Sequence, residues 1–327
     1  MGNRYSRTNI STNHRKGSHR PQTNKDANNV GTATTTSSLS RSTNSIIIEG
    51  REYHRMDTSS YCLPRDELEQ DRLNSQHFSL KALLGGNLLP SIESRIPRNA
   101  NVLDLGCGSG CWVMEMAIEH PEFEVTGIDM ADMFPATIRP ENVKFEICDI
   151  MAGLPYPDNS FDFIHMRLMI VALRGNEWPL VLKEAYRVLK PGGIIGLVES
   201  DFTEKTDKPI VDKFNGEFFK AMKSLGQDPQ IGSKLSTLLA EADFEIKDFQ
   251  ERFLCYGLPL DPIAREMLIN WKSAMLSLKP LLAHRVTTDI DLYPDIVEKY
   301  IEGIVEAAWI VKIWAFSAQK PIAVEQN

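Results

Sequence analysis

Short segments that are rich in apolar residues recur through the middle of the chain, and several carry an acid at or near their end. They lie at residues 102–105, 124–130, 143–150, 161–167 and 194–199. The first of them, with Val102, Leu103 and Leu105, is the kind of short apolar run that is typical of a strand buried on both faces of a sheet. A helical pattern follows the first run at once, with Val113, Met116 and Ala117 on one face. Strands that alternate with helices predict an α/β protein.

The later part of the chain contains longer periodic segments. Helical spacing covers residues 209–225, 232–242, 259–284 and 289–307, and two further strands are expected at 244–256 and 309–318. The segment 259–284 is richest in large apolar residues, among them Met267 and Trp271. We expect these two side chains to belong to the core rather than to line a pocket.

The segment before the first strand has a helical pattern of its own. An acidic cluster that starts at Asp66 follows Pro64 and suits the first turn of a helix, where negative charge interacts favourably with the helix dipole. Apolar residues then recur up to Leu84, so one or two amphipathic helices are expected between residues 49 and 87. Packing on the sheet as a helical cap is their simplest role.

The first 45 residues differ from the rest in composition. They carry seven Lys or Arg and one Asp, a net charge of +6, which leaves −14 for residues 46–327 of a chain whose total is −8. This tail is rich in Asn, Ser and Thr and is expected to be disordered and solvated. Its start, Met1-Gly2-Asn3-Arg4-Tyr5-Ser6, also fits the pattern for N-myristoylation at Gly2. One acyl chain would attach the protein only weakly to a membrane.

Composition also excludes several classes of function. The five cysteines show no paired framework and no metal-type spacing, so we expect no metal site and an intracellular location, cytoplasmic or nuclear. No apolar run is long enough to span a membrane. The acidic body offers no evident nucleic-acid site.

A glycine-rich loop stands between the first strand and its helix, with Gly106, Gly108 and Gly110 at alternate positions. Glycines let the backbone approach a ligand closely, and a helix N-terminus offers free N–H groups, so this corner is typical of nucleotide binding. A phosphate loop would need Lys followed by Ser or Thr, but Cys111 follows instead. Asp104, two residues before the first glycine, would repel a pyrophosphate and suits a cationic ligand. A glycine turn without a ligand is the alternative.

This D-x-G-x-G-x-G loop resembles motif I of the class I S-adenosylmethionine-dependent methyltransferases. The resemblance implies a Rossmann-like α/β fold, in which a sheet of seven mostly parallel strands has helices on both faces. The last strand would lie antiparallel between the fifth and the sixth. The Leu-x-Pro-Gly-Gly turn that starts at Leu189 is typical of this class and is not a feature of dehydrogenases. The implied methyltransferase domain spans residues 98–320, with a helical substrate cover at 259–307.

The same resemblance implies that the chain binds S-adenosyl-L-methionine. Asp129 ends the second strand 19 residues after Gly110, where a carboxylate can accept hydrogen bonds from both ribose hydroxyls. Asp149 would bond the adenine amino group, with Ile150 beside the ring. The full set of expected cofactor residues is Tyr61, Asp104, Gly106, Cys107, Gly108, Gly110, Asp129, Met130, Asp149, Ile150 and His165.

The segment before the first strand carries a more specific resemblance. A Y-x-L-P turn from Tyr61, an R-L-x-x-Q-H motif from Arg72 and a G-G-N motif from Gly85 are similar to fungal methyltransferases related to the global regulator of secondary metabolism. In that family the segment folds over the cofactor. Residues 46–97 are therefore expected to act as a helical lid, with Tyr61 near the bound ligand.

His165, at the end of the fourth strand, is the candidate catalytic residue. It could deprotonate an acceptor, close the cofactor pocket or make a structural hydrogen bond. Arg167 could bind a carboxylate or form a surface salt bridge, and Glu199 could orient an acceptor. Two functions are consistent with these residues. One is an enzyme that methylates a small-molecule or protein acceptor, and the other is a regulatory subunit that binds the cofactor but acts through a protein partner.

Overall fold

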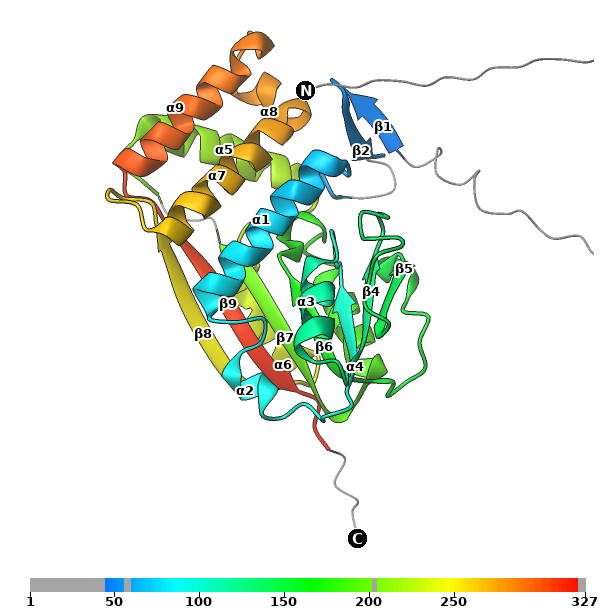
Figure 1. Cartoon of the computed structure of the whole chain (residues 1–327). Coiled ribbons are helices and arrows are strands. Elements are labelled where there is room, and N and C mark those ends of the chain that lie inside the picture. The colour runs from blue at the N-terminus through cyan, green and yellow to red at the C-terminus, as the bar shows by residue number, and fades with distance from the viewer. Residues whose placement is uncertain (1–44, 56–59, 202–204, 323–327) are drawn as a thin grey trace, which may run out of the picture. The chain divides into compact units, whose positions relative to one another are not determined.

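A seven-stranded sheet runs through the part of the chain that the computed structural model describes, which is residues 45–55, 60–201 and 205–322 (Figure 1). The predicted disordered tail and the acylation motif at Gly2 lie outside these residues, apart from Ser45, which begins a strand. The strands of the sheet are β3 (Asn101–Leu105), β4 (Glu124–Asp129), β5 (Val143–Ile147), β6 (Phe161–Arg167), β7 (Leu189–Asp201), β8 (Glu245–Cys255) and β9 (Ile310–Gln319).

The strand order across the sheet is β5-β4-β3-β6-β7-β9-β8. Neighbouring strands from β5 to β7 are parallel, whereas β9 pairs antiparallel with both β7 and β8. The predicted seven-stranded, mostly parallel sheet is confirmed, with its last strand between the fifth and the sixth. The order reverses at β3, and in open α/β sheets a ligand binds outside the carboxyl ends of the strands at such a point.

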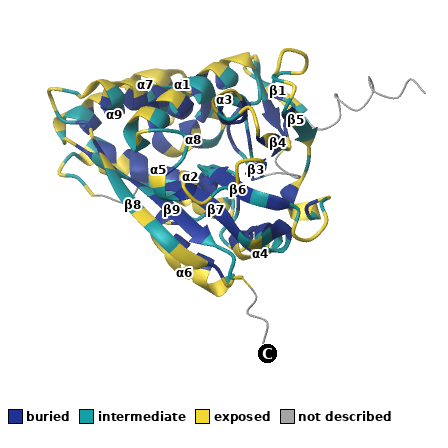
Figure 2. Ribbon diagram, turned by 60° about the horizontal axis from the view of Figure 1, so that its bottom comes forward, coloured by how far each residue is buried: buried dark blue, intermediate teal, exposed yellow. Residues whose placement is uncertain are grey.

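Helices cover both faces of the sheet, as Figure 2 shows with α1 and α3 on one side and α4 and α6 on the other. The helices are α1 (Glu67–Leu84), α2 (Pro90–Glu93), α3 (Cys111–Glu119), α4 (Trp178–Val188), α5 (Pro209–Ser224), α6 (Leu235–Glu241), α7 (Pro262–Ser277), α8 (Lys279–Val286) and α9 (Tyr293–Glu306). Because of this double cover, Val102, Leu103 and Leu105 of β3 are fully buried, as a continuous apolar strand requires. No helix within the described residues is both long and apolar enough to cross a membrane.

Four helices form a separate layer at one end of the sheet, where α5, α8 and α9 pack on one another and α7 packs on α9. The helical stretch predicted over residues 259–284 is helical and consists of two helices, because α7 ends at Ser277 and α8 starts at Lys279. Pro280 has no N–H to continue the hydrogen-bond ladder of α7, and it suits the first turn of a new helix. Asp261 caps the start of α7 by accepting hydrogen bonds from the N–H groups of Ile263 and Ala264.

The expected lid segment contains a hairpin as well as a helix. β1 (Ser45–Ile48) and β2 (Arg51–His54) pair antiparallel across a turn of two residues, Glu49 and Gly50, both with positive φ. The helix that follows, α1, begins after Asp66, whose side chain accepts the N–H of Glu69. Arg51 of the hairpin donates to the Asp66 carboxylate at 2.6 and 2.8 Å, so the hairpin is tied to the start of α1.

Candidate functional site

A cavity of about 290 Å³ lies at the carboxyl ends of the central strands. This volume is near the lower limit of small-molecule pockets, which span about 300–1,000 Å³. Nearly all of the predicted cofactor residues line it, namely Tyr61, Asp104, Gly106, Cys107, Gly108, Asp129, Met130, Asp149, Ile150 and His165. Gly110 is the exception. The cavity therefore gathers side chains from the ends of β3, β4, β5 and β6 and from the segment before α1.

The glycine loop lets neighbouring side chains come close to the backbone. Gly106, Gly108 and Gly110 all have positive φ, of 74°, 55° and 74°. A Cβ at Gly106 would collide with Met169, and one at Gly108 would lie 3.3 Å from Leu73 of α1. At Gly110 a Cβ would lie only 2.6 Å from the ring of Phe145. Gly110 thus allows packing behind the loop, while the other two glycines shape the cavity itself.

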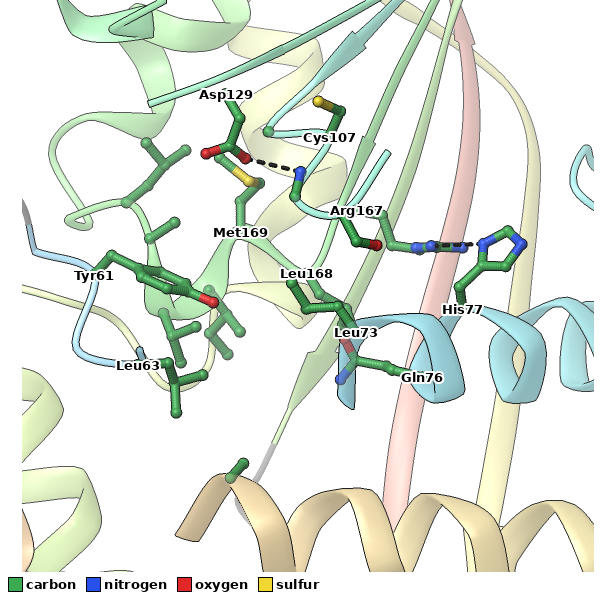
Figure 3. Close-up of a pocket in the computed structure, with 18 of the residues that line it drawn as sticks. Tyr61, Leu63, Leu73, Gln76, His77, Cys107, Asp129, Arg167, Leu168 and Met169 are labelled. Atoms are coloured by element: carbon green, nitrogen blue, oxygen red, sulfur yellow. Dashed lines mark hydrogen bonds between the residues drawn. The ribbon is translucent and has the colours of Figure 1, made fainter. Parts of the chain in front are cut away.

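Asp129 organises this loop from the end of β4. Its Oδ2 accepts the N–H of Gly108 at 2.8 Å (Figure 3). Its Oδ1 accepts the N–H of Ala131 at 2.9 Å. Burial raises the pKa of Asp129, and the same two hydrogen bonds oppose that shift. Each carboxylate oxygen has a second lone pair, so Asp129 can still accept hydroxyl donors from a ligand in the cavity.

Two further cofactor residues occupy the loop after β5. Asp149 accepts the N–H of Met151 at 2.9 Å through one oxygen, which leaves its second oxygen free for a ligand amino group. Ile150 is buried beside it and offers an apolar surface to a flat ring. Met130 and Cys107 also line this end of the cavity. Burial raises the pKa of the Cys107 thiol well above its usual value, so this side chain is a neutral contact.

His165 is held from two sides. Its Nδ1 lies 2.7 Å from Oδ1 of Asp104, and because a carboxylate only accepts, Nδ1 carries the proton. The indole of Trp112 stacks on the imidazole with ring centroids 3.9 Å apart and an interplanar angle of 5°. Burial lowers the pKa of His165, although Asp104 opposes the shift. The ring is therefore neutral and fixed in one tautomer.

Helix α1 lies beside α7 (Figure 1), and residues of both helices line the cavity. The two helices are joined by a buried polar group, in which Arg72 pairs with Glu69 and donates to Oδ1 of Asn270 at 2.8 Å. Asn270 in turn donates to the backbone carbonyl of Arg72 at 2.6 Å. Tyr61, which lines the cavity, places its hydroxyl 3.3 Å from the Glu69 carboxylate. The segment around α1 is thus fixed to the later helices by satisfied hydrogen bonds.

Arg167 ends β6 at the other side of the glycine loop. Its guanidinium donates to Nδ1 of His77 at 3.1 Å (Figure 3). Nε2 of His77 lies 2.7 Å from the Glu115 carboxylate. The prediction left Arg167 between a carboxylate site and a surface salt bridge. No carboxylate of the described residues forms a salt bridge with it, and its side chain lines the cavity.

Glu199 lies outside the cavity lining, contrary to the expectation that it orients an acceptor. One oxygen of its carboxyl group accepts the N–H of Met169, so Glu199 supports the wall from behind. Its side chain is 1% exposed, and burial raises its pKa to about 8. The sequence placed Glu199 at the end of β7 but could not show which way the side chain points.

The far end of the cavity is apolar, and a helical substrate cover at 259–307 was predicted without naming its lining residues. The lining comes from α7 and from the ends of β8 and β9, and consists of Tyr256, Met267, Trp271, Ala274, Val311 and Ile313. Met267 belongs to the buried core, as expected, and Trp271 packs against it, and both side chains also line the cavity. The spacing that predicted α7 identifies its buried face, but it cannot distinguish a core from the wall of a pocket.

The donor and acceptor set fits the expected cofactor. Carboxylates at Asp104, Asp129 and Asp149 suit a ligand that presents an ammonium, ribose hydroxyls and an adenine amino group. The close contacts at Gly106 and Gly108 leave backbone, instead of side chains, facing the cavity. Each of these residue roles remains a prediction.

Comparison with known proteins agrees with this site. Residues 102–193 match the family described as "Methyltransferase domain". The chain is similar to the secondary metabolism regulator laeA of Aspergillus flavus, with 32% identity over 65% of this chain and 57% of that protein. It is also similar to methyltransferase pytC of Aspergillus terreus, with 32% identity over 76% of this chain and 78% of that protein.

Among solved structures, the mycolic acid cyclopropane synthase CmaA1, complexed with SAH and CTAB, aligns with a TM-score of 0.51. The identity is 15%, and the alignment covers 75% of this chain and 84% of the synthase, so the likeness concerns the fold. The chain spans little more than half the length of the laeA regulator. What the longer relatives do as whole proteins therefore bears on this chain only by analogy.

Proposed function

Because the chain belongs to the family of S-adenosylmethionine-dependent methyltransferases, we propose that it transfers a methyl group from this cofactor to an acceptor held in the apolar end of its cavity. The observation that carries the proposal is the continuity of that cavity. A single space connects the carboxylates at the ends of β4 and β5 with the apolar surface under α7.

The proposed residue roles follow from the contacts. Asp129 and Asp149 hold the ribose and adenine parts, and Asp104 faces the ammonium. The bound cofactor supplies an electrophilic methyl group, which must be shielded from water. Leu73 of α1 and Met169 close the space over the glycine loop and exclude that water. Positioning and desolvation are then the protein's main contributions to methyl transfer.

His165 is assigned to the cavity wall. Its Nδ1 proton is engaged by Asp104 and one ring face is covered by Trp112, so the imidazole cannot turn toward an acceptor. The neutral Nε2 is the ring atom through which a proton could be accepted. An acceptor that loses its proton spontaneously, or a thioether that has none, would need no base.

A second role is favoured by the similarity to a protein named as a regulator. In that role the chain binds the cofactor and acts through a protein partner. Attachment through Gly2 acylation and an intracellular location, cytoplasmic or nuclear, belong to this proposal as well. The acylation rests on the sequence pattern at the start of the chain, and the location rests on the five cysteines without a paired framework.

Incubation of the full chain with S-adenosylmethionine labelled in its methyl group, and with a fungal cell extract, tests the proposal. We expect label in a small molecule or a protein, separated by size, and none with the Asp129→Ala variant. A chain that binds the cofactor but labels neither fraction would support the regulatory role. A chain that does not bind the cofactor would contradict both.

A further inference from the structure

We propose that Arg167, held in place by His77 and Glu115, forms a carboxylate-binding site in the cavity at the end of β6. The proposal rests on the proposed function. It assigns the carboxylate to the amino-acid part of the cofactor, and a carboxylate on the acceptor is the second source that the same chemistry would allow.

The hydrogen bonds behind Arg167 fix its direction. A guanidinium only donates, so Nδ1 of His77 accepts at 3.1 Å and the imidazole proton sits on Nε2, which donates to Glu115 at 2.7 Å. His77 is 1% exposed, and burial together with the charge of Arg167 lowers its pKa to about 4. A neutral His77 can serve as an acceptor for Arg167 throughout the physiological pH range.

Glu115 anchors this chain of hydrogen bonds without neutralising Arg167. Its carboxylate accepts from Lys81 at 2.9 and 3.0 Å and from Asn87 at 3.0 Å, besides His77. Although burial opposes its ionisation, these donors lower the pKa of Glu115 to about 2. The negative charge is therefore present but is engaged by Lys81, on the far side of His77 from the cavity.

The guanidinium of Arg167 retains unused donors. Within the described residues, the hydrogen bond of Arg167 to His77 uses Nη2 alone, while a guanidinium carries five N–H groups in a planar fork. Burial lowers the pKa of Arg167, which still remains protonated because an arginine does not lose its charge in proteins. A carboxylate can accept two parallel hydrogen bonds from such a fork and offset the cost of burying the charge.

The strand order places this site at the expected end of the cofactor. Asp149, Asp129, the glycine loop and Arg167 follow β5, β4, β3 and β6, which are successive neighbours in the sheet. Arg167 therefore lies two strands, roughly 10 Å, from Asp129. A ligand with adenine and ribose on the first two strands extends its amino-acid part over the loop toward β6. Leu73 and His77, one turn apart on α1, cover this path.

Calorimetric titration with two ligands tests the proposal on the full chain. S-adenosylhomocysteine has the amino-acid carboxylate, and 5′-methylthioadenosine lacks the whole amino-acid part. We expect Arg167→Met to weaken the binding of S-adenosylhomocysteine about tenfold to a hundredfold, because a charge-assisted pair is lost. The affinity for 5′-methylthioadenosine should not change. Arg167→Lys should recover part of the affinity. The control is Arg174→Met, which removes an arginine that is already paired with Glu177 at 2.6 Å.

The second possibility, that Arg167 binds a carboxylate of the methyl acceptor, is tested with benzoate, an apolar carboxylate. Benzoate is titrated into the chain saturated with S-adenosylhomocysteine. Benzoate binding that Arg167→Met abolishes, with nucleoside affinity intact, would support the carboxylate site but assign it to the acceptor. Unchanged binding of both S-adenosylhomocysteine and benzoate in a folded Arg167→Met variant would overturn the proposal. Equal weakening of both nucleosides would also overturn it, because Arg167 would then only support the fold. A wild-type chain that binds neither nucleoside would instead refute the proposed function.

Discussion

Glu199 illustrates at the residue scale how burial changes the chemistry of a side chain. Its pKa is raised to about 8 from 4.5 by burial, so the folded protein retains a proton that the unfolded chain releases. The folded state therefore binds more protons between these values, and this contribution to stability is lost as the pH rises through them. When the pH rises from 6 to 7.5, we expect the free energy of unfolding of the wild type to fall by about 2 kcal/mol relative to that of Glu199→Gln, which has no titrating group at this position.

Urea unfolding at the two pH values measures this difference. Glu184→Gln is the control, because Arg187 lowers the pKa of Glu184 and that carboxylate is ionised at both pH values. An identical pH dependence of the wild type and Glu199→Gln would show that Glu199 is ionised in the folded protein.

The sequence allowed a residue to be placed at the cavity where the end of a strand fixes the position of its side chain. Asp104 and Asp129 lie at the cavity because the parallel strands β3 and β4 end at the same edge. The partners of Arg167 could not be predicted in this way, because His77 and Glu115 come from two helices distant in sequence. Gly110 packs against Phe145 and does not line the cavity, and the sequence could not show this because a packing glycine and a ligand-facing glycine have the same sequence signature.

At the scale of elements, the contact between α1 and α7 depends on Asn270. This side chain is 4% exposed and satisfies both a guanidinium nitrogen and the backbone carbonyl of Arg72. Asn270→Ala would leave the buried guanidinium nitrogen without this partner and the Arg72 carbonyl with its helical hydrogen bond alone, so we expect a loss of about 1–3 kcal/mol in the free energy of unfolding. Hydrogen exchange should also become faster in α1 and α7, and not in α3.

Lys272→Ala serves as the control for Asn270, because Lys272 lies on the same helix but pairs with Glu298 at the surface. Its effect should be within about 0.5 kcal/mol. If Asn270→Ala leaves the exchange of α1 unchanged, the two helices are held together by their apolar contacts alone.

The lid function of the segment before β3 is tested at Tyr61. Its ring lines the cavity, and an aromatic side chain can cover the methionine part of the cofactor. We expect Tyr61→Ala to weaken S-adenosylhomocysteine several-fold in calorimetry, with an unchanged melting curve. Tyr61→Phe keeps the ring and should retain most of the affinity. Full affinity in Tyr61→Ala would transfer the lid role to α7.

Elements that depend on local pattern were predicted, and those that depend on distant partners were not. Among the central strands, β3 and β6 are apparent in the sequence because nearly all of their residues are buried, whereas the edge strand β5 is partly exposed and is marked by the acid that follows it, Asp149. The β1–β2 hairpin was missed, although Glu49-Gly50 after three isoleucines is a signal for a tight turn. Its position depends on contacts such as the hydrogen bond from Tyr53 to the carbonyl of Ser277 at 2.7 Å.

At the scale of the whole molecule, the sheet and the helical layer have separate tasks. The sheet edge carries the polar residues expected to hold the cofactor, and α7 with β8 and β9 provides the apolar surface for the acceptor. This division explains why the cofactor follows from the sequence while the acceptor does not.

The most direct test of the account is a calorimetric titration of the full chain with S-adenosylhomocysteine and, separately, with NAD. We expect one site for S-adenosylhomocysteine and no binding of NAD. Asp129→Ala should lose roughly 1.5–3 kcal/mol of binding free energy, because two charge-assisted hydrogen bonds to the ribose disappear. Tight binding of NAD without a response to S-adenosylhomocysteine would contradict the account.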